Sequence, residues 1–205
     1  MIESKPVKIG ANMKAIEMLK NEHRLIEKVL AALEYYIGAI DKGEEIDRRD
    51  LAKFTAFIRT FADSCHHGKE EGILFAEMIE RGFSREQGPV AVMLMEHNEG
   101  RRLISRLNAL ADKKEPWAEN DRQEISRTAT EYIDLLRRHI MKEDNILYPA
   151  AEQNIPPEIM TAMYDRFERF EEEETGVGEH EKFHRMAEEL VRRYSPGASP
   201  ANHHH

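Results

Sequence analysis

The 205-residue chain has a single cysteine, Cys65, so no disulfide can form within it. No stretch approaches the roughly 18 consecutive apolar residues that a membrane-spanning helix needs. No apolar segment of the signal-peptide type follows the N-terminus, and secretion is therefore not expected. These absences predict a cytoplasmic protein.

Positive charge is also scarce, because 30 Lys and Arg side chains face 39 Asp and Glu, for a formal charge of −9. This balance disfavours binding to nucleic acid or to an anionic membrane surface. Hydrophobic residues make up 40% and charged residues 34% of the chain, as is typical of folded globular proteins. We expect a soluble protein with neither nucleic acid nor a membrane as a partner.

Apolar residues recur at helical spacing along most of the chain, and no run alternates with a period of two for long enough to predict a sheet. The stripes predict four long helices, over residues 11–40, 47–81, 88–112 and 120–152. Short connections between amphipathic helices favour an all-α, antiparallel up-down-up-down four-helix bundle, formed by residues 1–152.

Two further helices are expected beyond the bundle. One begins at Pro156-Pro157 and ends near Gly176, and the other runs from about Glu179 to Tyr194. Together they predict a C-terminal helical extension, residues 153–194, packed on the outside of the bundle. Residues 195–205 are expected to form a disordered tail, whose last three histidines resemble the remnant of an affinity tag.

The second and fourth helices carry the same ten-residue pattern. His66-His67-Gly68-Lys69-Glu70-Glu71-Gly72-Ile73-Leu74-Phe75 aligns without a gap with His139-Ile140-Met141-Lys142-Glu143-Asp144-Asn145-Ile146-Leu147-Tyr148. In this register His66 matches His139, and Glu70 matches Glu143. The echo predicts that the two helices are related by an approximate two-fold axis.

A histidine and a glutamate four residues apart lie on one face of a helix, so one turn offers an imidazole nitrogen and a carboxylate oxygen to the same volume. Two such turns facing each other can hold two metal ions, and bundle cores build di-iron and di-manganese sites in this way. Four buried imidazoles and two buried carboxylates would be costly without ions that neutralise them. The predicted ligands are His23, His66, Glu70, His97, His139 and Glu143.

His67 and Glu71 form a competing pair with the same spacing. On an α-helical wheel His66 lies about 80° from the apolar face of this helix and His67 about 180° from it. The internal repeat also aligns His66 with His139. Both arguments favour His66 with Glu70, and they leave His67 and Glu71 as less certain ligands.

A ligand set of nitrogen and oxygen atoms favours iron, manganese or zinc over calcium and magnesium. The lack of cysteine pairs disfavours a structural zinc site. Two iron ions are the expected cofactor, with manganese or zinc as alternatives. Open coordination positions on such a pair would bind a small ligand such as dioxygen, nitric oxide or peroxide.

From about residue 11 to residue 152 the pattern resembles the hemerythrin-like, or HHE cation-binding, family. It has a lone histidine on the first and third helices and His-x-x-x-Glu on the second and fourth. The phrases that begin at Lys69 and Lys142 resemble the family's recurrent Lys-Glu-Glu-x-x-Leu-Phe-Pro. The resemblance implies an antiparallel bundle with a non-haem, carboxylate-bridged di-iron centre, in a protein that acts as a carrier, sensor, iron-repair protein or weak peroxidase.

The sequence departs from the oxygen-carrying hemerythrins in one position. They carry a second histidine one turn after the ligand of the third helix, where this chain has Arg101, and this disfavours reversible oxygen carriage. Their last ligand is an aspartate five residues after the histidine, so Asp144 is an alternative to Glu143. His180 or His184, in the extension, could replace the absent histidine or contact a ligand.

Three functions fit these residues. The first is a module that binds or senses dioxygen, nitric oxide or a related ligand, with any protein partner unknown. The second is a di-iron oxidoreductase that processes peroxide or nitric oxide, or an iron storage or repair protein. The third is a structural zinc or manganese protein. The motifs favour the first and leave the question of catalysis open.

Overall fold

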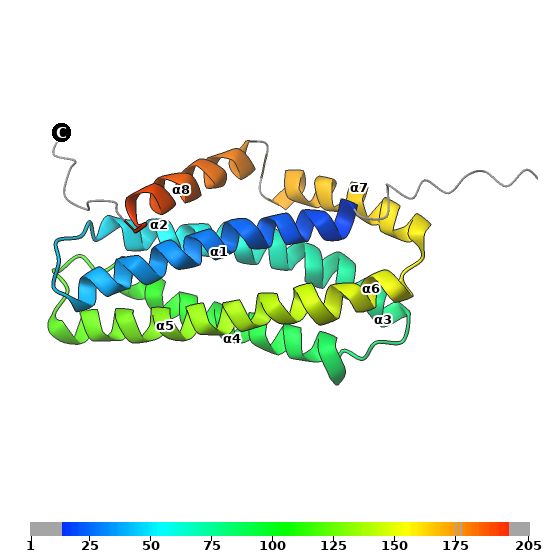
Figure 1. Cartoon of the computed structure of the whole chain (residues 1–205), viewed down its shortest axis with the longest axis horizontal. Coiled ribbons are helices and arrows are strands. Elements are labelled where there is room, and N and C mark those ends of the chain that lie inside the picture. Colours follow the sequence, from blue (N-terminus) through cyan, green and yellow to red (C-terminus); the bar gives the residue numbers. More distant parts are fainter. Residues whose placement is uncertain (1–13, 175, 177, 197–205) are drawn as a thin grey trace, which may run out of the picture.

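The apolar stripes form helices in the computed structural model, which describes residues 14–174, 176 and 178–196. No strand occurs among these residues, and the predicted all-helical class is confirmed. Four helical rods lie side by side (Figure 1). They are α1 (Lys14–Asp41), a second rod from Arg49 to Glu80, α4 (Gly88–Ala111), and a fourth rod from Glu119 to Asn154.

Glycines end the first two rods. Gly43 has φ +70°, and its N–H donates to the Ile40 carbonyl (3.0 Å) while the next N–H reaches Ala39 (2.9 Å). Gly82, with φ +96°, closes the second rod in the same way. Glycine is favoured at both positions because a positive φ places a Cβ atom against the backbone.

The second and fourth rods contain turns with the wider π-helical hydrogen-bonding pattern, in which an N–H bonds to the carbonyl five residues earlier. The second rod consists of α2 (Arg49–Phe57), η1 (Ile58–His67), η2 (Glu70–Leu74) and α3 (Phe75–Glu80). The fourth consists of α5 (Glu119–Lys142), η3 (Glu143–Leu147) and α6 (Tyr148–Asn154). All three π segments lie where the sequence places the two His-x-x-x-Glu motifs.

The buried core has two apolar parts with a polar layer between them. On α1, Leu19 belongs to one part and Ile26 to the other, and the buried His23 lies between them. On α4, His97 likewise separates Met93 from Leu103. The polar residues of the other two rods are placed in the same way. The two apolar parts therefore exclude water from both ends of the polar layer.

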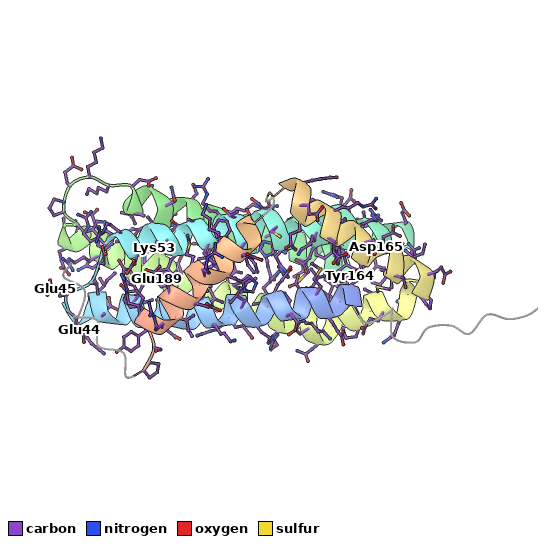
Figure 2. The ribbon with its side chains drawn as sticks, turned by 90° about the horizontal axis from the view of Figure 1, so that it is seen from above. Glu44, Glu45, Lys53, Tyr164, Asp165 and Glu189 are labelled. Carbon is purple, nitrogen blue, oxygen red and sulfur yellow. The ribbon has the colours of Figure 1, made fainter. Side chains whose placement is uncertain are left out.

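The extension consists of α7 (Pro157–Glu174) and α8 (Glu179–Arg193), and both lie along the α1 and α2 side of the molecule (Figures 1 and 2). The Asp50 carboxylate, buried on α2, accepts hydrogen bonds from Arg193 (2.5 Å) and from the Tyr194 hydroxyl (2.6 Å). Residues 197–205 of the expected tail lie outside the described residues. Within the described part of the chain, no helix is long and apolar enough to cross a membrane.

Candidate metal centre

The polar layer brings together all six residues that the sequence predicts as ligands, and each is at most 1% exposed. They project from all four rods: His23 from α1, His66 and Glu70 from η1 and η2, His97 from α4, and His139 and Glu143 from α5 and η3.

Their donor atoms form two sets, and within each set the atoms lie within 4.8 Å of one another. Glu70 belongs to both sets. Glu143 also faces both, because its carboxylate lies 3.2 Å from His23 Nε2 and 3.0 Å from His139 Nε2. The first set is His23, His66, Glu70 and Glu143, and the second is His67, Glu70, His97 and His139.

His67 therefore joins the site together with its neighbour His66. The α-helical wheel placed it on the side opposite the apolar face, but it is only 5% exposed, and its ring stacks on that of His97 with 3.8 Å between centroids. The wheel fails here because η1 is a wider helix, which turns through a smaller angle per residue than an α-helix. Two consecutive histidines can then face the same interior.

The five imidazoles are oriented by carboxylates. In each ring Nδ1 is paired with an Asp or Glu side chain, so Nε2 is left to face the centre, as in metal-binding histidines generally. The pairs are His23 with Asp144 (2.9 Å), His66 with Glu22 (2.8 Å), His67 with Asp63 (3.4 Å), His97 with Glu71 (2.7 Å) and His139 with Glu96 (3.0 Å).

These carboxylates are in turn paired with cations. Lys69 donates to Glu22, and Lys142 donates to Glu96, so the two lysines of the internal repeat occupy equivalent places. Arg24 donates to Asp144, while Arg101 donates to both Asp63 (2.8 Å) and Glu71 (2.6 Å). The surroundings of the five rings thus contain five acids and four bases, which fixes each ring in place.

Burial and neighbouring charges perturb the centre strongly. Burial and the adjacent Glu143 carboxylate raise the pKa of Glu70. Burial also acts to raise the pKa of Glu143, but three histidines, His139 above all, outweigh it and lower that pKa. Burial lowers the pKa of both His66 and His67. Burial also acts to lower the pKa of His139, but the Glu143 and Glu96 carboxylates outweigh this effect and raise that pKa to about 9.

Several polar atoms at the centre are buried without a hydrogen bond. They are His66 Nε2, Glu70 Oε2 and both carboxylate oxygens of Glu143. A buried polar atom without a partner costs about 1–3 kcal/mol, and more when it is charged. Metal ions would satisfy these lone pairs and neutralise the two carboxylates. The donor set therefore fits a pair of cations with nitrogen and oxygen ligands.

Tyr148 adds a hydroxyl group to the first donor set. It donates a hydrogen bond to Glu70 Oε1 (2.7 Å), and its oxygen lies 3.2 Å from His23 Nε2. Burial and the neighbouring Glu70 raise the pKa of this phenol, so it keeps its proton at neutral pH. Tyr148 is thus a buried hydrogen-bond donor beside the shared carboxylate.

The remaining candidates lie outside the two donor sets. Glu71 and Asp144 orient His97 and His23, as described above. His184 on α8 packs edge-on against Phe61, with 5.7 Å between ring centroids. The side chain of His180 lies outside the described residues.

Sequence reasoning missed Glu22 and Glu96, which orient His66 and His139. A signal was present, because each glutamate immediately precedes a predicted ligand: Glu22-His23 on α1 is matched by Glu96-His97 on α4. The repeated dipeptide is the counterpart, on the first and third rods, of the repeat on the second and fourth. Asp63 had no comparable signal, since its role depends on the burial of His67.

The chain is similar in sequence to two kinds of known protein. An uncharacterized protein of Mycobacterium tuberculosis (strain ATCC 25618 / H37Rv) is 24% identical over 162 residues, which are 78% of this chain and 61% of the relative. The iron-sulfur cluster repair protein YtfE of Enterobacter sp. (strain 638) is 35% identical over 135 residues, 64% of this chain and 60% of the relative. The chain thus spans about three fifths of these relatives. No solved structure matches it.

The family model for the hemerythrin HHE cation-binding domain matches residues 14–151. This segment includes every residue of the two donor sets and all five carboxylates that orient the imidazoles. The chain therefore belongs to the hemerythrin HHE cation-binding domain family.

Proposed function

We propose that this protein is an antiparallel up-down-up-down four-helix bundle that holds two iron ions and binds dioxygen, nitric oxide or peroxide at them. The observation that carries the proposal is the pair of donor sets sharing Glu70. Five imidazoles and two carboxylates project into one buried layer, and four of their polar atoms have no hydrogen bond.

The five imidazoles are divided three to two. His67, His97 and His139 would hold one iron, and His23 and His66 the other, with Glu70 and Glu143 available to both. Arg101 stands where oxygen-carrying hemerythrins have a histidine, and His67 offers a third imidazole from the neighbouring rod instead. Arg101 therefore does not reduce the number of imidazoles available to the proposed centre.

When bound, two irons supply one-electron redox chemistry and Lewis acidity. The protein's own contribution is to orient the ligands and to hold a hydrogen-bond donor beside them. The carboxylates behind each imidazole fix its Nε2 toward the centre, and the two apolar parts of the core close the polar layer at both ends of the bundle. Tyr148 holds a proton on its hydroxyl, 2.7 Å from Glu70 Oε1.

The test is the metal content per chain after anaerobic reconstitution with ferrous iron, together with the visible spectrum before and after dioxygen or nitric oxide is added. Two irons per chain and a spectrum that changes with the gas support the proposal. Colourless protein that retains zinc or manganese in competition with iron would contradict it.

A second candidate is the repair of damaged iron–sulfur clusters. It is favoured by the relatives that bear this name, one of which is 35% identical over 135 residues. Incubating the iron-loaded protein with a [4Fe–4S] hydratase inactivated by nitric oxide separates the two functions. Recovery of hydratase activity beyond that given by free ferrous iron supports repair, and recovery equal to that of free iron opposes it.

A further inference from the structure

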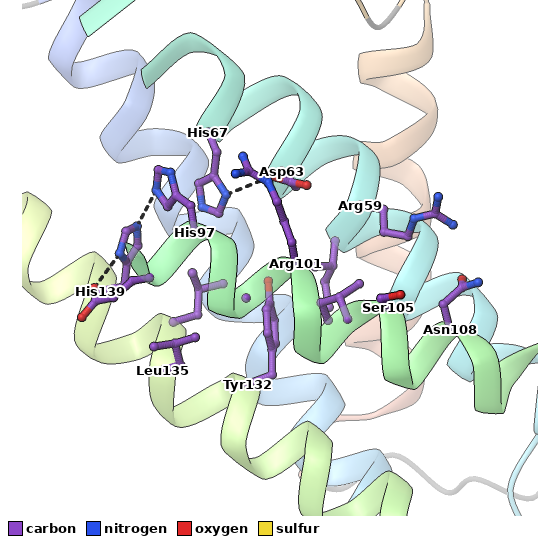
Figure 3. A pocket seen from close by; sticks show the side chains of 15 residues that line it. Arg59, Asp63, His67, His97, Arg101, Ser105, Asn108, Tyr132, Leu135 and His139 are labelled. Atoms are coloured by element: carbon purple, nitrogen blue, oxygen red, sulfur yellow. Dashed lines mark hydrogen bonds and ion pairs between the residues drawn. The ribbon is translucent and has the colours of Figure 1, made fainter. Parts of the chain in front are cut away.

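A cavity of about 380 Å³ opens beside the three-histidine donor set, between η1, α4 and α5 (Figure 3). His67, His97 and His139 form part of its wall. At about 30 Å³ for each water molecule, the space would hold roughly a dozen waters. It is therefore far larger than a diatomic gas requires, and its size falls within the range of pockets that bind small organic molecules.

Away from the histidines, the wall of the cavity has both apolar and polar side chains, and the apolar ones come from three helices. The apolar part of the wall consists of Ile58 of η1, Ile104 of α4, and Leu135 and Leu136 of α5. Gly100 adds room, because the absence of a side chain there keeps the space in front of Tyr132 open. A short hydrocarbon chain could bury its surface against these residues.

The charges on the wall are unequally satisfied. Asp63 is paired with Arg101 and His67, and Glu96 with Lys142 and His139. Arg59 is exposed and makes no ion pair with any residue in the described part of the chain. Its guanidinium is thus the one unneutralised charge among the acids and bases of the described wall, and it favours an anionic ligand.

A second polar group on the wall is the hydroxyl of Tyr132. The residue as a whole is only 2% exposed, but its hydroxyl oxygen is not among the buried polar atoms without a partner, and no hydrogen bond joins it to another described residue. In Figure 3 this hydroxyl lies between the histidines and Arg59. A phenolic hydroxyl on a cavity wall can donate a hydrogen bond to an oxygen atom of a ligand in that cavity.

We propose that the cavity binds a small organic monocarboxylate that has one more oxygen atom outside its carboxylate. The carboxylate pairs with Arg59, and the apolar chain packs against Ile58, Ile104 and Leu136. The additional oxygen atom accepts a hydrogen bond from Tyr132. The proposal that the acid binds depends only on the residues of the cavity, and not on the metal ions. A role for this acid as a co-ligand or substrate of the metal centre rests on the proposed function.

Calorimetric titration of the metal-free and the iron-loaded protein with hexanoate, 1-hexanol and 5-oxohexanoate tests the proposal. Hexanoate should bind about tenfold more tightly than hexanol, and Arg59→Gln should remove this difference. Arg85→Gln is the matched control, because Arg85 is also an exposed arginine but does not line the cavity. The oxo acid should bind more tightly than hexanoate to the wild type but not to Tyr132→Phe.

No hexanoate binding at concentrations up to about 10 mM, equal affinity for hexanoate and hexanol, or unchanged affinity in Arg59→Gln would each overturn the proposal. Arg59 is a surface residue, so its variant should fold normally. If the protein binds hexanoate but fails to take up iron, the cavity site is supported and the di-iron function is refuted. If the protein takes up two irons but does not bind hexanoate, only the cavity site is refuted.

Discussion

His67 shows that a donor position can be supplied from a neighbouring rod. Its ring lies against His97 of α4, and Arg101, one turn further along α4, orients rings through Asp63 and Glu71 instead of ligating. In the proposed centre, a histidine on η1 would bind metal, and an arginine on α4 balances the charge of the carboxylates that orient the rings. The three-histidine set depends on both residues.

Replacing His67 with glutamine should weaken one of the two metal positions. We expect iron content to fall from about two toward one per chain, because the affected position loses one of its three imidazoles. Metal analysis of anaerobically reconstituted protein measures this. His184→Gln is the control, since it also removes a partly buried imidazole but leaves both donor sets intact. Equal losses in the two variants would show that His67 is not a ligand.

Replacing Glu70 with glutamine should have opposite effects on stability and on metal binding. The two buried carboxylates raise each other's energy without metal, so the neutral amide should stabilise metal-free protein on the order of 1 kcal/mol. Its carbonyl oxygen can still accept the Tyr148 hydrogen bond. Urea unfolding of the metal-free protein measures the gain, and iron content should fall. A less stable metal-free variant would contradict this account of the pair.

At the residue scale the sequence alone predicts six of the seven residues in the donor sets. Histidine and glutamate four residues apart share a face in an α-helix and also in the slightly wider helix found here, so the prediction that His66 and Glu70 lie together holds for both helix types. The predicted direction of His67 differs between them, because it depends on the angle that the helix turns per residue. The partners that orient the rings depend on contacts between rods, which no single helical pattern contains.

At the scale of elements, α7 packs closely on the second rod. A Cβ atom added to Gly68 would lie 2.7 Å from Cζ of Phe170. The next residue, Lys69, also contacts α7, because it donates a hydrogen bond to Glu171 (3.2 Å). Lys69 is fully buried beneath α7, whereas its counterpart Lys142 has a side chain that is 29% exposed. The extension therefore covers one half of an otherwise two-fold centre.

Gly68→Ala should therefore destabilise the protein, and Gly72→Ala should not. Gly72 has no atom within 4 Å of an added Cβ, so alanine there should gain about 0.5–1 kcal/mol from helix propensity. At Gly68 the clash with Phe170 should cost about 1–3 kcal/mol, which exceeds that gain. Urea unfolding of both variants tests the difference. Equal stabilities would mean that α7 does not pack here as described.

The helix positions could be predicted from the sequence to within a few residues, because glycine turns and apolar stripes mark them directly. The π-helical segments could not. A bond to the carbonyl five residues earlier leaves the same apolar residues on the inner face, and the sequence pattern of η2 or η3 is therefore compatible with either helix type.

At the scale of the whole molecule, the polar layer divides the core and leaves buried charge that only cations neutralise fully. Metal bound to the folded state alone stabilises it by about 2.7 kcal/mol when free metal is at 100 times its dissociation constant. We therefore expect a chelator to lower the thermal midpoint and ferrous iron to restore it. Calorimetry in both states measures the shift, and an unchanged midpoint would show that the layer is stable without metal.

The division of the core follows from the sequence, since a polar residue interrupts the apolar stripe of each rod at a comparable level. The cavity beside α4 and α5 does not follow from it, because cavities depend on how side chains of different rods meet. That the Arg59 guanidinium and the Tyr132 hydroxyl have no partner among the described residues could be recognised only in the folded arrangement.

The most direct test of the central claim is anomalous diffraction at the iron absorption edge from crystals of the iron-loaded protein. The account predicts two iron peaks in the polar layer, one beside His67, His97 and His139 and the other beside His23 and His66, with Glu70 in contact with both. A single peak, or iron bound outside this layer, would contradict it.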